Sequence, residues 1–486
     1  MIHKTPSLLI RISFFILLCI SISCSQKSSN DNALTKESEQ QDIFHRDLDE
    51  IREDGKLRAL IIYSSTSYFL YRGRAMGYEY EQLKRLAKSL NLELELYVAE
   101  NIDSLFSELK KGTADIVAHG LTITRERKKN VQFTDYLYLT RQVLVQKKPD
   151  NWRHLTWSSL QRALIKDPLE LINDTISVRE NTSYFERIGN LSKEIGGPIY
   201  IDTIRGNIST DKIINQVVQG TIKYTIADEY IAKINASYYP ILDVSVPVSF
   251  SQRIAWAVRP NSPQLLEAVN TWIQKERKEV DYHVIYNKYF ENKRNFKQRV
   301  KSDFYSLNKN QISKYDDIIK KHAQRIGWDW RLLTSLIYQE SRFEPAAASW
   351  AGAKGLMQLM PETAKELGVL NIFDIAQNIQ GGTNYLQQIY NKFDEVKDSI
   401  QRIKLTMASY NCGYYHVLDA QNLAERKGYD KHTWDGNVEE MILDLSYPEN
   451  YKNEVVKYGY VRGIEPFTYV KQIFQRYKHY TNFIKK

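Results

Sequence analysis

Hydrophobic and polar positions change period several times in the first half of the chain. Three strands are predicted, at 57–63 (LRALIIY), 92–98 (LELELYV) and 114–118 (ADIVA). Two helices separate them, with apolar faces formed by Leu83, Leu86, Ala87 and Leu90 and by Leu105, Phe106 and Leu109. This βαβαβ order predicts a mostly parallel sheet covered by helices, whose ligands bind beyond the carboxyl ends of the strands.

The second half, from Ser313 onward, has helical periodicity instead. Ser313 and Asp329 are candidate N-caps, Pro361 fits a first helical position, and Gly327 and Gly368 are candidate helix stops. Further helices are expected at 378–393 and 403–412, and strands are hard to place. We therefore expect a mainly α domain after an α/β domain.

Glu340 interrupts one of these helical patterns. Leu333, Leu336 and Ile337 recur at helical spacing, and Glu340 is the next position on that apolar face. A carboxyl group that loses water has a raised pKa, and a protonated carboxyl can act as a general acid on a glycosidic oxygen. The alternative is a glutamate that ends its helix in solvent. Local capping explanations suffice for the competing carboxylates of Asp329, Glu344 and Glu362.

Composition narrows the class of protein. The 486 residues are too many for one ordinary core, and 43% hydrophobic with 26% charged residues is typical of globular domains. The net charge of +9 allows an anionic polymer or surface as partner, but no compact Lys/Arg block favours nucleic acid. The segment 293–311 is a basic joint without Gly or Pro, and we expect it to be partly helical.

Cysteine and histidine usage argues against a metal site. The cysteines are Cys19, Cys24 and Cys412, and Cys19 falls inside a predicted export signal. The mature chain is therefore not expected to hold a disulfide. The nine histidines show no HExxH or comparable ligand spacing, so neither a metal nor another cofactor is expected.

The first residues have the features of an export signal. Lys4 and Arg11 precede a short apolar stretch at 12–22, and the "SISCS" around Cys24 resembles a lipoprotein cleavage site. Residues 1–23 are then a signal peptide and 24–48 a polar tether that begins with a lipidated Cys24. Ser21, where Leu is usual, departs from the pattern, and an ordinary secreted protein is the alternative. Ser25 is not the aspartate associated with inner-membrane retention, so we expect a periplasm-facing lipoprotein of the outer membrane.

The segment 118–138 (AHGLTITRERKKNVQFTDYLY) resembles the signature of family 3 periplasmic solute-binding proteins. The resemblance extends over 49–292 and implies two α/β lobes around a cleft, with crossover strands near 138–148 and 245–258. It implies that Thr122 and Arg127 hold a ligand carboxylate and that Asp228 holds its ammonium group. An amino acid or a peptide-like ligand is expected, and the alternative is a domain retained only as a scaffold.

Residues 312–486 resemble the lytic transglycosylase domain of the soluble-transglycosylase type, which has a lysozyme-like fold. Its elements appear in order as Glu340–Ser341, Gly355–Gln358 and Ala408–Asn411, and Tyr469 matches the tyrosine of a closing segment. Cys412 and the Pro466–Phe467 pair depart from the usual residues. The two domains in this order resemble the membrane-bound lytic murein transglycosylases.

The resemblance implies cleavage of the β-1,4 bond between N-acetylmuramic acid and N-acetylglucosamine in peptidoglycan, leaving 1,6-anhydro ends. Glu340 would act first as acid and then as base, with the glycan strand held by Ser341, Met357, Gln358, Tyr410, Asn411 and Tyr469. The first domain would bind an amino acid or stem peptide and regulate activity. A lysozyme-type hydrolase and a non-catalytic cell-wall peptide sensor are the alternatives.

Overall fold

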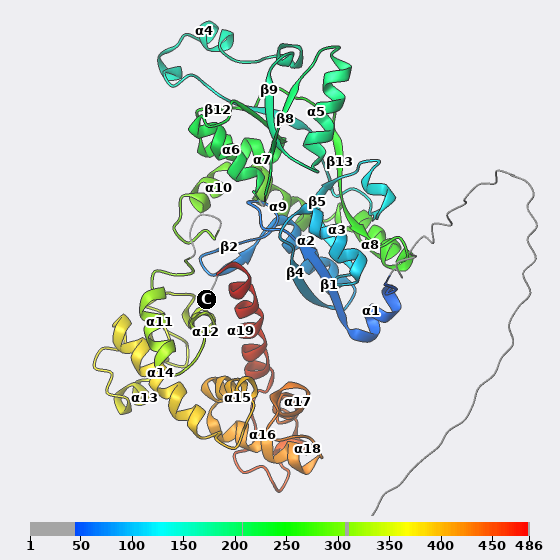
Figure 1. Ribbon diagram of the computed structural model, residues 1–486. Helices are drawn as coiled ribbons and strands as arrows, with labels where there is room; N and C mark the ends of the chain where they lie inside the picture. The colour runs from blue at the N-terminus through cyan, green and yellow to red at the C-terminus, as the bar shows by residue number, and fades with distance from the viewer. Residues whose placement is uncertain (1–43, 207, 307–310, 485–486) are drawn as a thin grey trace, which may run out of the picture. The chain divides into compact units, whose positions relative to one another are not determined.

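The computed structural model describes residues 44–206, 208–306 and 311–484 of the protein (Figure 1). The predicted signal peptide, the lipidated Cys24 and most of the predicted tether lie outside the described residues. No helix within the described ranges is both long enough and apolar enough to cross a membrane.

The first lobe is built on one mixed sheet with the strand order β4-β1-β5-β13-β6, and β7 also pairs with β13. The strands β1, β4 and β5 are mutually parallel, as the βαβαβ pattern predicts, and β13 runs antiparallel to β5. The strands are β1 (Lys56–Ile61), β4 (Glu93–Val98), β5 (Ile116–Thr122), β6 (Gln132–Phe133), β7 (Tyr138–Thr140) and β13 (Gln252–Val258).

Helices cover this sheet and bury its apolar side chains (Figure 1). They are α1 (Leu48–Asp54), α2 (Tyr78–Ser89), α3 (Ile102–Lys111), α8 (Pro263–Glu276) and α9 (Val280–Tyr286). Gly112 ends α3 in the left-handed region with φ of 81°. A small hairpin of β2 (Phe69–Tyr71) and β3 (Arg74–Met76) extends from the same lobe.

The second lobe contains two small sheets. In one, β8 pairs antiparallel with β11 and β12, and in the other β9 pairs parallel with β10. The strands are β8 (Gln142–Lys147), β9 (Thr175–Arg179), β10 (Tyr200–Ile204), β11 (Tyr224–Asp228) and β12 (Leu242–Asp243). The helices are α4 (Trp157–Arg162), α5 (Ser183–Glu194), α6 (Thr210–Gln219) and α7 (Glu229–Tyr238).

The chain crosses between the lobes twice. It leaves the first lobe after β7 and enters the second lobe at β8. It returns between Pro247, which bridges to Val143 of β8, and the start of β13. Both crossings fall within the predicted segments 138–148 and 245–258, so the two-lobed α/β fold is confirmed.

The basic joint contacts both lobes. Its helix α10 (Lys293–Val300) contacts α7 of the second lobe. Farther along, Tyr305 bridges to Tyr71 of β2, and the Arg72 N–H donates to Phe304 O at 3.1 Å. The joint is therefore partly helical, as expected, and links the two lobes to the chain that follows.

The residues described after 311 are mainly α, as predicted, with only isolated bridges between extended residues. Their helices are α11 (Asp316–Arg325), α12 (Trp330–Ser341), α13 (Pro361–Glu366), α14 (Ile375–Asn391), α15 (Ser399–Cys412), α16 (Tyr414–Arg426), α17 (Glu439–Asp444), α18 (Pro448–Tyr451) and α19 (Ile464–Phe483). One large apolar core joins them, with α12 packed between α11 and α19.

The predicted N-cap is correct for α12 and wrong for α11. Asp329 caps α12 through its carboxylate, which accepts from the Arg331 N–H. Ser313 does not cap α11, which begins three residues later at Asp316. The Ser313 hydroxyl instead donates to the buried carboxylate of Asp316 at 2.7 Å, so a side-chain hydrogen bond has replaced the cap.

Candidate functional site

Glu340 lies where the apolar face of α12 ends. Leu333, Leu336 and Ile337 are completely buried, and Glu340 follows them on the same face with part of its surface exposed. The backbone then turns sharply, with φ of 52° at Arg342 and 67° at Phe343. Left-handed backbone at two consecutive non-glycine residues is unfavourable, and such outliers are concentrated at functional sites.

The carboxyl group of Glu340 is hydrogen-bonded to Tyr469. The Tyr469 hydroxyl, on the buried face of α19, donates to Glu340 Oε1. Burial raises the pKa of Glu340 to about 7, and the hydrogen bond from Tyr469 opposes that rise. A pKa near 7 allows the carboxyl to be protonated or ionised near neutral pH, and the residue keeps part of its surface exposed.

The turn 355–359 and the end of α15 form the adjoining wall. The Tyr410 hydroxyl donates to Met357 O at 2.7 Å. The pKa of Tyr410 is raised mainly by burial and also by the nearby charge of Glu340. Gln358 has φ of 48°, and its side-chain amide donates to Gly355 O and Ala347 O. Asn411, next to Tyr410, is exposed.

Two predicted glycan-contacting residues have different environments from those expected. Met357 is completely buried in the core, which corrects the expectation that its side chain lines the groove. Its backbone instead forms two hydrogen bonds near the site. The Met357 N–H donates to Asn378 Oδ1 at 2.8 Å, and the Met357 carbonyl accepts from the Tyr410 hydroxyl. Ser341 is also buried, and its hydroxyl donates to Ile337 O at 3.1 Å, so any role at the glycan stays a prediction.

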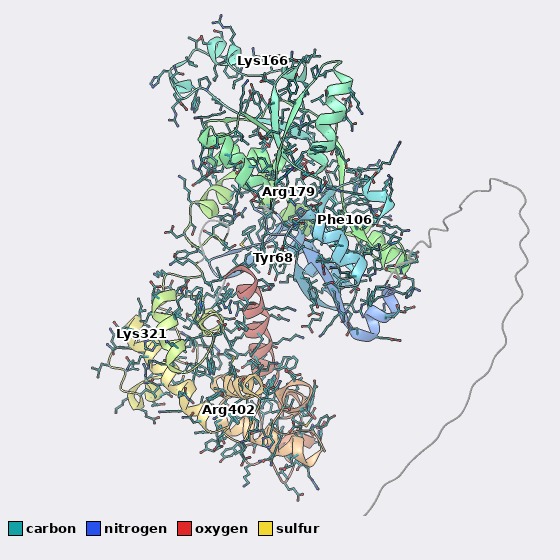
Figure 2. All side chains as sticks on the ribbon, viewed as in Figure 1. Tyr68, Phe106, Lys166, Arg179, Lys321 and Arg402 are labelled. Atoms are coloured by element: carbon teal, nitrogen blue, oxygen red, sulfur yellow. The ribbon has the colours of Figure 1, made fainter. Side chains whose placement is uncertain are left out.

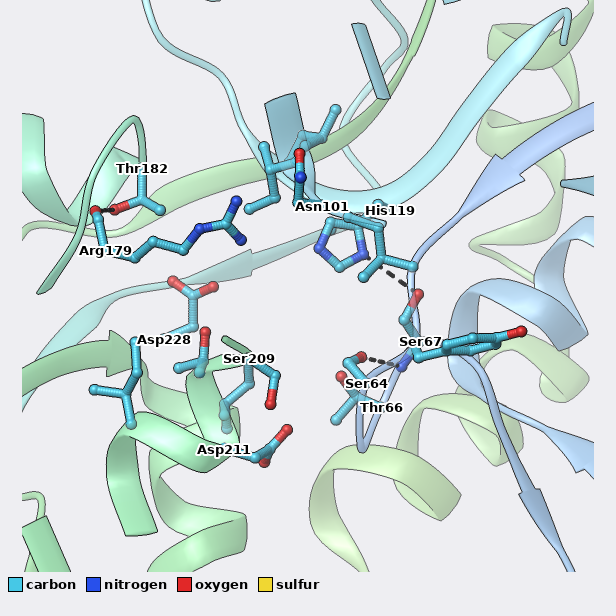
Figure 3. Close-up of a pocket in the computed structure, with 18 of the residues that line it drawn as sticks. Ser64, Thr66, Ser67, Asn101, His119, Arg179, Thr182, Ser209, Asp211 and Asp228 are labelled. Carbon is cyan, nitrogen blue, oxygen red and sulfur yellow. Dashed lines mark hydrogen bonds between the residues drawn. The ribbon is translucent and has the colours of Figure 1, made fainter. Parts of the chain in front are cut away.

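A second site is the cleft of the α/β domain, a cavity of about 780 Å³ lined from both lobes (Figure 3). Thr122, Arg127 and Asp228, predicted from the sequence to share a ligand, all line it. Arg127 Nη1 donates to Thr122 O at 3.1 Å, and its guanidinium lies 5.8 Å from the ring centre of Phe106, labelled in Figure 2. Burial lowers the pKa of Arg127.

Asp228 has an unpaired carboxylate oxygen in this cleft. It ends β11, and its Oδ2 accepts from the Tyr184 hydroxyl at 3.2 Å, whereas the buried Oδ1 has no hydrogen-bond partner. Burial raises the pKa of Asp228 to about 6. A buried acceptor without a partner is costly, and a ligand ammonium group would satisfy it.

Several other titratable groups in the cleft were not predicted from the sequence. Burial raises the pKa of Glu79 to about 7 and lowers the pKa of His119 to about 4. Asp211 of the second lobe accepts from the Ser65 hydroxyl of the first at 2.9 Å, and Arg179 lies 3.6 Å from Asp103 across the same gap. Figure 3 shows His119 on one side of the cavity and Arg179 and Asp211 on the other. His119 lies within the recognised segment 118–138 but was not assigned a role there, whereas Glu79, Arg179 and Asp211 lie outside it. The approach of the lobes brings Arg179 and Asp211 of the second lobe to the same cavity as Glu79 and His119 of the first.

Two family models match the chain. Residues 62–292 match the bacterial extracellular solute-binding proteins, family 3, and residues 317–433 match the transglycosylase SLT domain. A membrane-bound lytic murein transglycosylase F from Desulfosudis oleivorans is 34% identical, with 88% of this chain and 90% of the relative covered. The chain belongs to the membrane-bound lytic murein transglycosylase F family.

A second relative of the same description, from Photobacterium profundum, is 29% identical over 92% of this chain and 84% of its own. Among solved structures, a mutant of ArgBP from T. maritima is 26% identical, with a TM-score of 0.42, covering 50% of this chain and 99% of that one. Membership in the family accounts for the order of the two domains, ligand-binding first and catalytic second.

Proposed function

We propose that the protein is a peptidoglycan lytic transglycosylase and that Glu340 is its catalytic acid and base. The observation that carries the proposal is the Glu340 carboxyl, held by Tyr469 with a pKa of about 7, in a residue that keeps part of its surface exposed. A group that must donate and then accept a proton works best with a pKa near the working pH.

In the first step, protonated Glu340 gives its proton to the glycosidic oxygen between N-acetylmuramic acid and N-acetylglucosamine as that bond breaks. The N-acetyl group of the substrate stabilises the cation that develops on the muramic acid ring. In the second step, ionised Glu340 takes the proton of the C6 hydroxyl, whose oxygen closes the 1,6-anhydro ring. The carboxyl is protonated again at the end, and no water is consumed.

The surrounding residues shape this cycle. Tyr469 donates to the carboxylate form of Glu340 and therefore stabilises the intermediate stage in which the proton has left. Tyr410, anchored on Met357 O, and Gln358, fixed by two backbone carbonyls, present rigid polar groups to the sugar. Tyrosine suits a sugar because its ring packs on apolar C–H faces and its hydroxyl reaches the polar edge.

The test compares the wild type with Glu340→Gln on purified peptidoglycan. We expect anhydro-muramic ends from the wild type and their loss in the variant, while Glu344→Gln, a nearby exposed carboxylate, stays active. Reducing ends from the wild type would identify a lysozyme-type hydrolase instead. An inactive wild type that still binds cell-wall peptides would favour the sensor alternative.

We propose that the first domain binds an amino acid or stem peptide as a zwitterion. Thr122 and Arg127 would receive its carboxylate, and the unpaired oxygen of Asp228 its ammonium group. The volume of about 780 Å³ lies in the range of drug-sized ligand pockets, roughly 300–1,000 Å³, which favours a short peptide over a free amino acid.

We propose further that this ligand regulates the catalytic site through α19. Thr481 and Asn482 at its C-terminal end line the ligand cavity, and Tyr469 nearer its N-terminal end bonds Glu340. Between them, the Tyr480 hydroxyl donates to Gly73 O at 2.8 Å, and His479 bonds Tyr68, labelled in Figure 2. A ligand that binds one lobe arrangement more tightly would bias the position of this helix.

Calorimetry with a stem tetrapeptide and with free amino acids tests this proposal. Binding by the wild type, loss of binding in Asp228→Asn and a peptide-dependent change in glycan cleavage are expected. Absence of binding by every one of these ligands would leave the domain as a scaffold and reject the regulatory role.

We propose finally that Cys24 carries a lipid anchor in the cell envelope, with the outer membrane as its site. The membrane-bound description of the relatives supports envelope association. Mass spectrometry of the membrane fraction should find acylated Cys24, and Cys24→Ser should release the protein in soluble form. An unmodified Cys24 in a soluble wild type would exclude the anchor.

A further inference from the structure

Two exposed tyrosines stack on each other at the surface of the catalytic domain. Tyr415 is the second residue of α16, and Tyr458 lies in the loop that precedes α19. Their ring centres are 4.4 Å apart with 24° between the ring planes. Tyr415 remains 51% exposed and Tyr458 48% exposed, so much of this aromatic surface faces water. We refer to Tyr415 and Tyr458 together as the tyrosine platform.

The platform is held in place by a buried carboxylate. Asp419, one turn along α16 from Tyr415, is completely buried. Its two oxygens accept from the backbone N–H groups of Lys457, at 2.9 Å, and Tyr458, at 2.6 Å. A buried carboxylate is costly unless it is paired or hydrogen-bonded, so these two bonds fix the loop against the helix. The stacking of the rings is therefore imposed by the fold.

Both tyrosines lie on segments that adjoin, along the chain, residues close to Glu340. Tyr415 follows the Tyr410–Asn411 wall after a single break at Gly413, which has φ of 95°. Tyr458 precedes the helix that carries Tyr469. The platform is thus joined by short stretches of chain to Tyr410, which feels the charge of Glu340, and to Tyr469, which is hydrogen-bonded to it.

The cationic side chain of Lys392 lies beside one ring of the tyrosine platform. Lys392 Nζ lies 4.6 Å from the ring centre of Tyr414 and 6.0 Å from that of Tyr415. Lys392 is exposed at the end of α14, where its ammonium group can meet an anion from solvent. Peptidoglycan offers both partners along one strand, because its sugar rings have apolar faces and its peptide stems end in carboxylates.

We infer that the tyrosine platform is an additional sugar-binding subsite, which holds the glycan strand away from the bond that is cut. One sugar ring stacks on the exposed aromatic surface, and Lys392 pairs with a carboxylate of the attached stem. This inference rests on the proposed glycan-cleaving function. It adds a prediction that the enzyme favours long strands, which reach from Glu340 to the platform, over short ones.

The experiment measures KM and kcat on a long uncross-linked glycan strand and on a tetrasaccharide that spans only the cleaved bond. Tyr415→Ala and Tyr458→Ala are each expected to raise KM on the long strand about fivefold to tenfold. Neither variant should change kcat, or KM on the tetrasaccharide. Tyr415→Trp keeps an aromatic face and should retain the wild-type KM.

The matched control is Tyr429→Ala, which removes a tyrosine of similar exposure, 46%, just beyond the other end of α16. It should leave KM unchanged on both substrates. Thermal melting of all variants shows whether each remains folded. The dissociation constant for the long strand, measured by sedimentation with Glu340→Gln as the parent protein, gives a readout that does not depend on turnover.

Unchanged affinity for the long strand in both platform variants would overturn the inference, as would an equal loss on long and short substrates. A change of oligomeric mass in these variants without a change in glycan affinity would also overturn it. That result would mean that the platform forms a contact between protein copies and does not bind glycan. These outcomes differ from failure of the proposed function, in which the wild type itself releases no anhydro products.

Discussion

At the scale of single residues, the protonation of Glu340 connects structure to activity. An ordinary glutamate would be ionised at neutral pH and unable to donate a proton. Burial raises the pKa of Glu340 to about 7, while the Tyr469 hydroxyl limits the rise. Removal of the hydroxyl should therefore make the carboxyl a weaker acid, not a stronger one.

The first prediction concerns the pH profile. Because the proposed cycle begins with protonated Glu340, kcat/KM should fall as pH rises above about 7. In Tyr469→Phe the pKa of Glu340 should rise further, which moves the alkaline limb to higher pH, while kcat drops because the carboxylate stage loses its donor. Initial rates on soluble glycan across the pH range measure both effects. An alkaline limb that does not move in Tyr469→Phe would contradict the assignment.

The second prediction is the stability counterpart of the first. The folded pKa of Glu340, about 7, exceeds its unfolded value of 4.5, so the folded state binds more protons between these values. The free energy of unfolding should therefore fall as pH rises through that window. Glu340→Gln cannot ionise, and it should lose less stability than the wild type between about pH 5 and about pH 8. Parallel denaturation curves for the two proteins at these pH values would reject the raised pKa.

At the scale of elements, the catalytic wall depends on how closely α14 approaches the turn at 355–359. A Cβ on Gly382 would lie 2.4 Å from Met357 Sδ and 2.8 Å from Met357 Cβ. Met357 O in turn accepts from Tyr410. Because Gly382 has no side chain, α14 can pack closely against Met357, whose carbonyl accepts the hydrogen bond from Tyr410.

The third prediction uses two helical glycines. Gly382→Ala should displace Met357 and lower the free energy of unfolding by about 1–3 kcal/mol, with a lower kcat because Tyr410 moves. Gly189→Ala in α5 is the control, because a Cβ there meets nothing within 4 Å. It should be neutral or stabilising by about 0.4–1 kcal/mol. Thermal melting and glycan cleavage measure both, and an equal response of the two variants would refute the packing argument.

At the scale of the whole molecule, the cleft and the catalytic site are connected by one helix. The α19 helix has Tyr469 on Glu340 and, farther along, Lys478 paired with Glu95 of β4 at 2.9 Å. Its last residues line the ligand cavity. Under the proposed regulation, the charge of Asp228 in that cavity controls ligand binding, and ligand binding changes the activity of Glu340.

The fourth prediction concerns the pH dependence of the ligand. Asp228 has a pKa of about 6 and must be ionised to hold an ammonium group, so ligand affinity should weaken as pH falls below about 6. Binding near that pH should release a proton, because the bound ammonium favours the carboxylate. Calorimetry in buffers of different ionisation enthalpy measures the release. Affinity that is constant down to about pH 5 would show that Asp228 does not contact the ammonium group.

The sequence was most informative where function requires local patterns. Alternating strand and helix periods indicated the parallel β1, β4 and β5, and three ordered motifs indicated the position of Glu340. The role of Met357 could not be predicted from the sequence, because an apolar methionine side chain suits a substrate-contacting position and a buried core position equally well. Ser313 shows the same limit at a helix start, since its hydroxyl could cap a helix or bond Asp316.

By itself, the sequence determined that an α/β domain precedes a mainly α domain, and which residue is expected to act as acid. It could do so because periodicity and motif spacing are local properties of the chain. Only the tertiary structure decided the pKa of Glu340, the pairing with Tyr469 and the stacking of Tyr415 on Tyr458. Each depends on groups distant in sequence that packing brings together, and the loss of water that shifts a pKa exists only once they are packed.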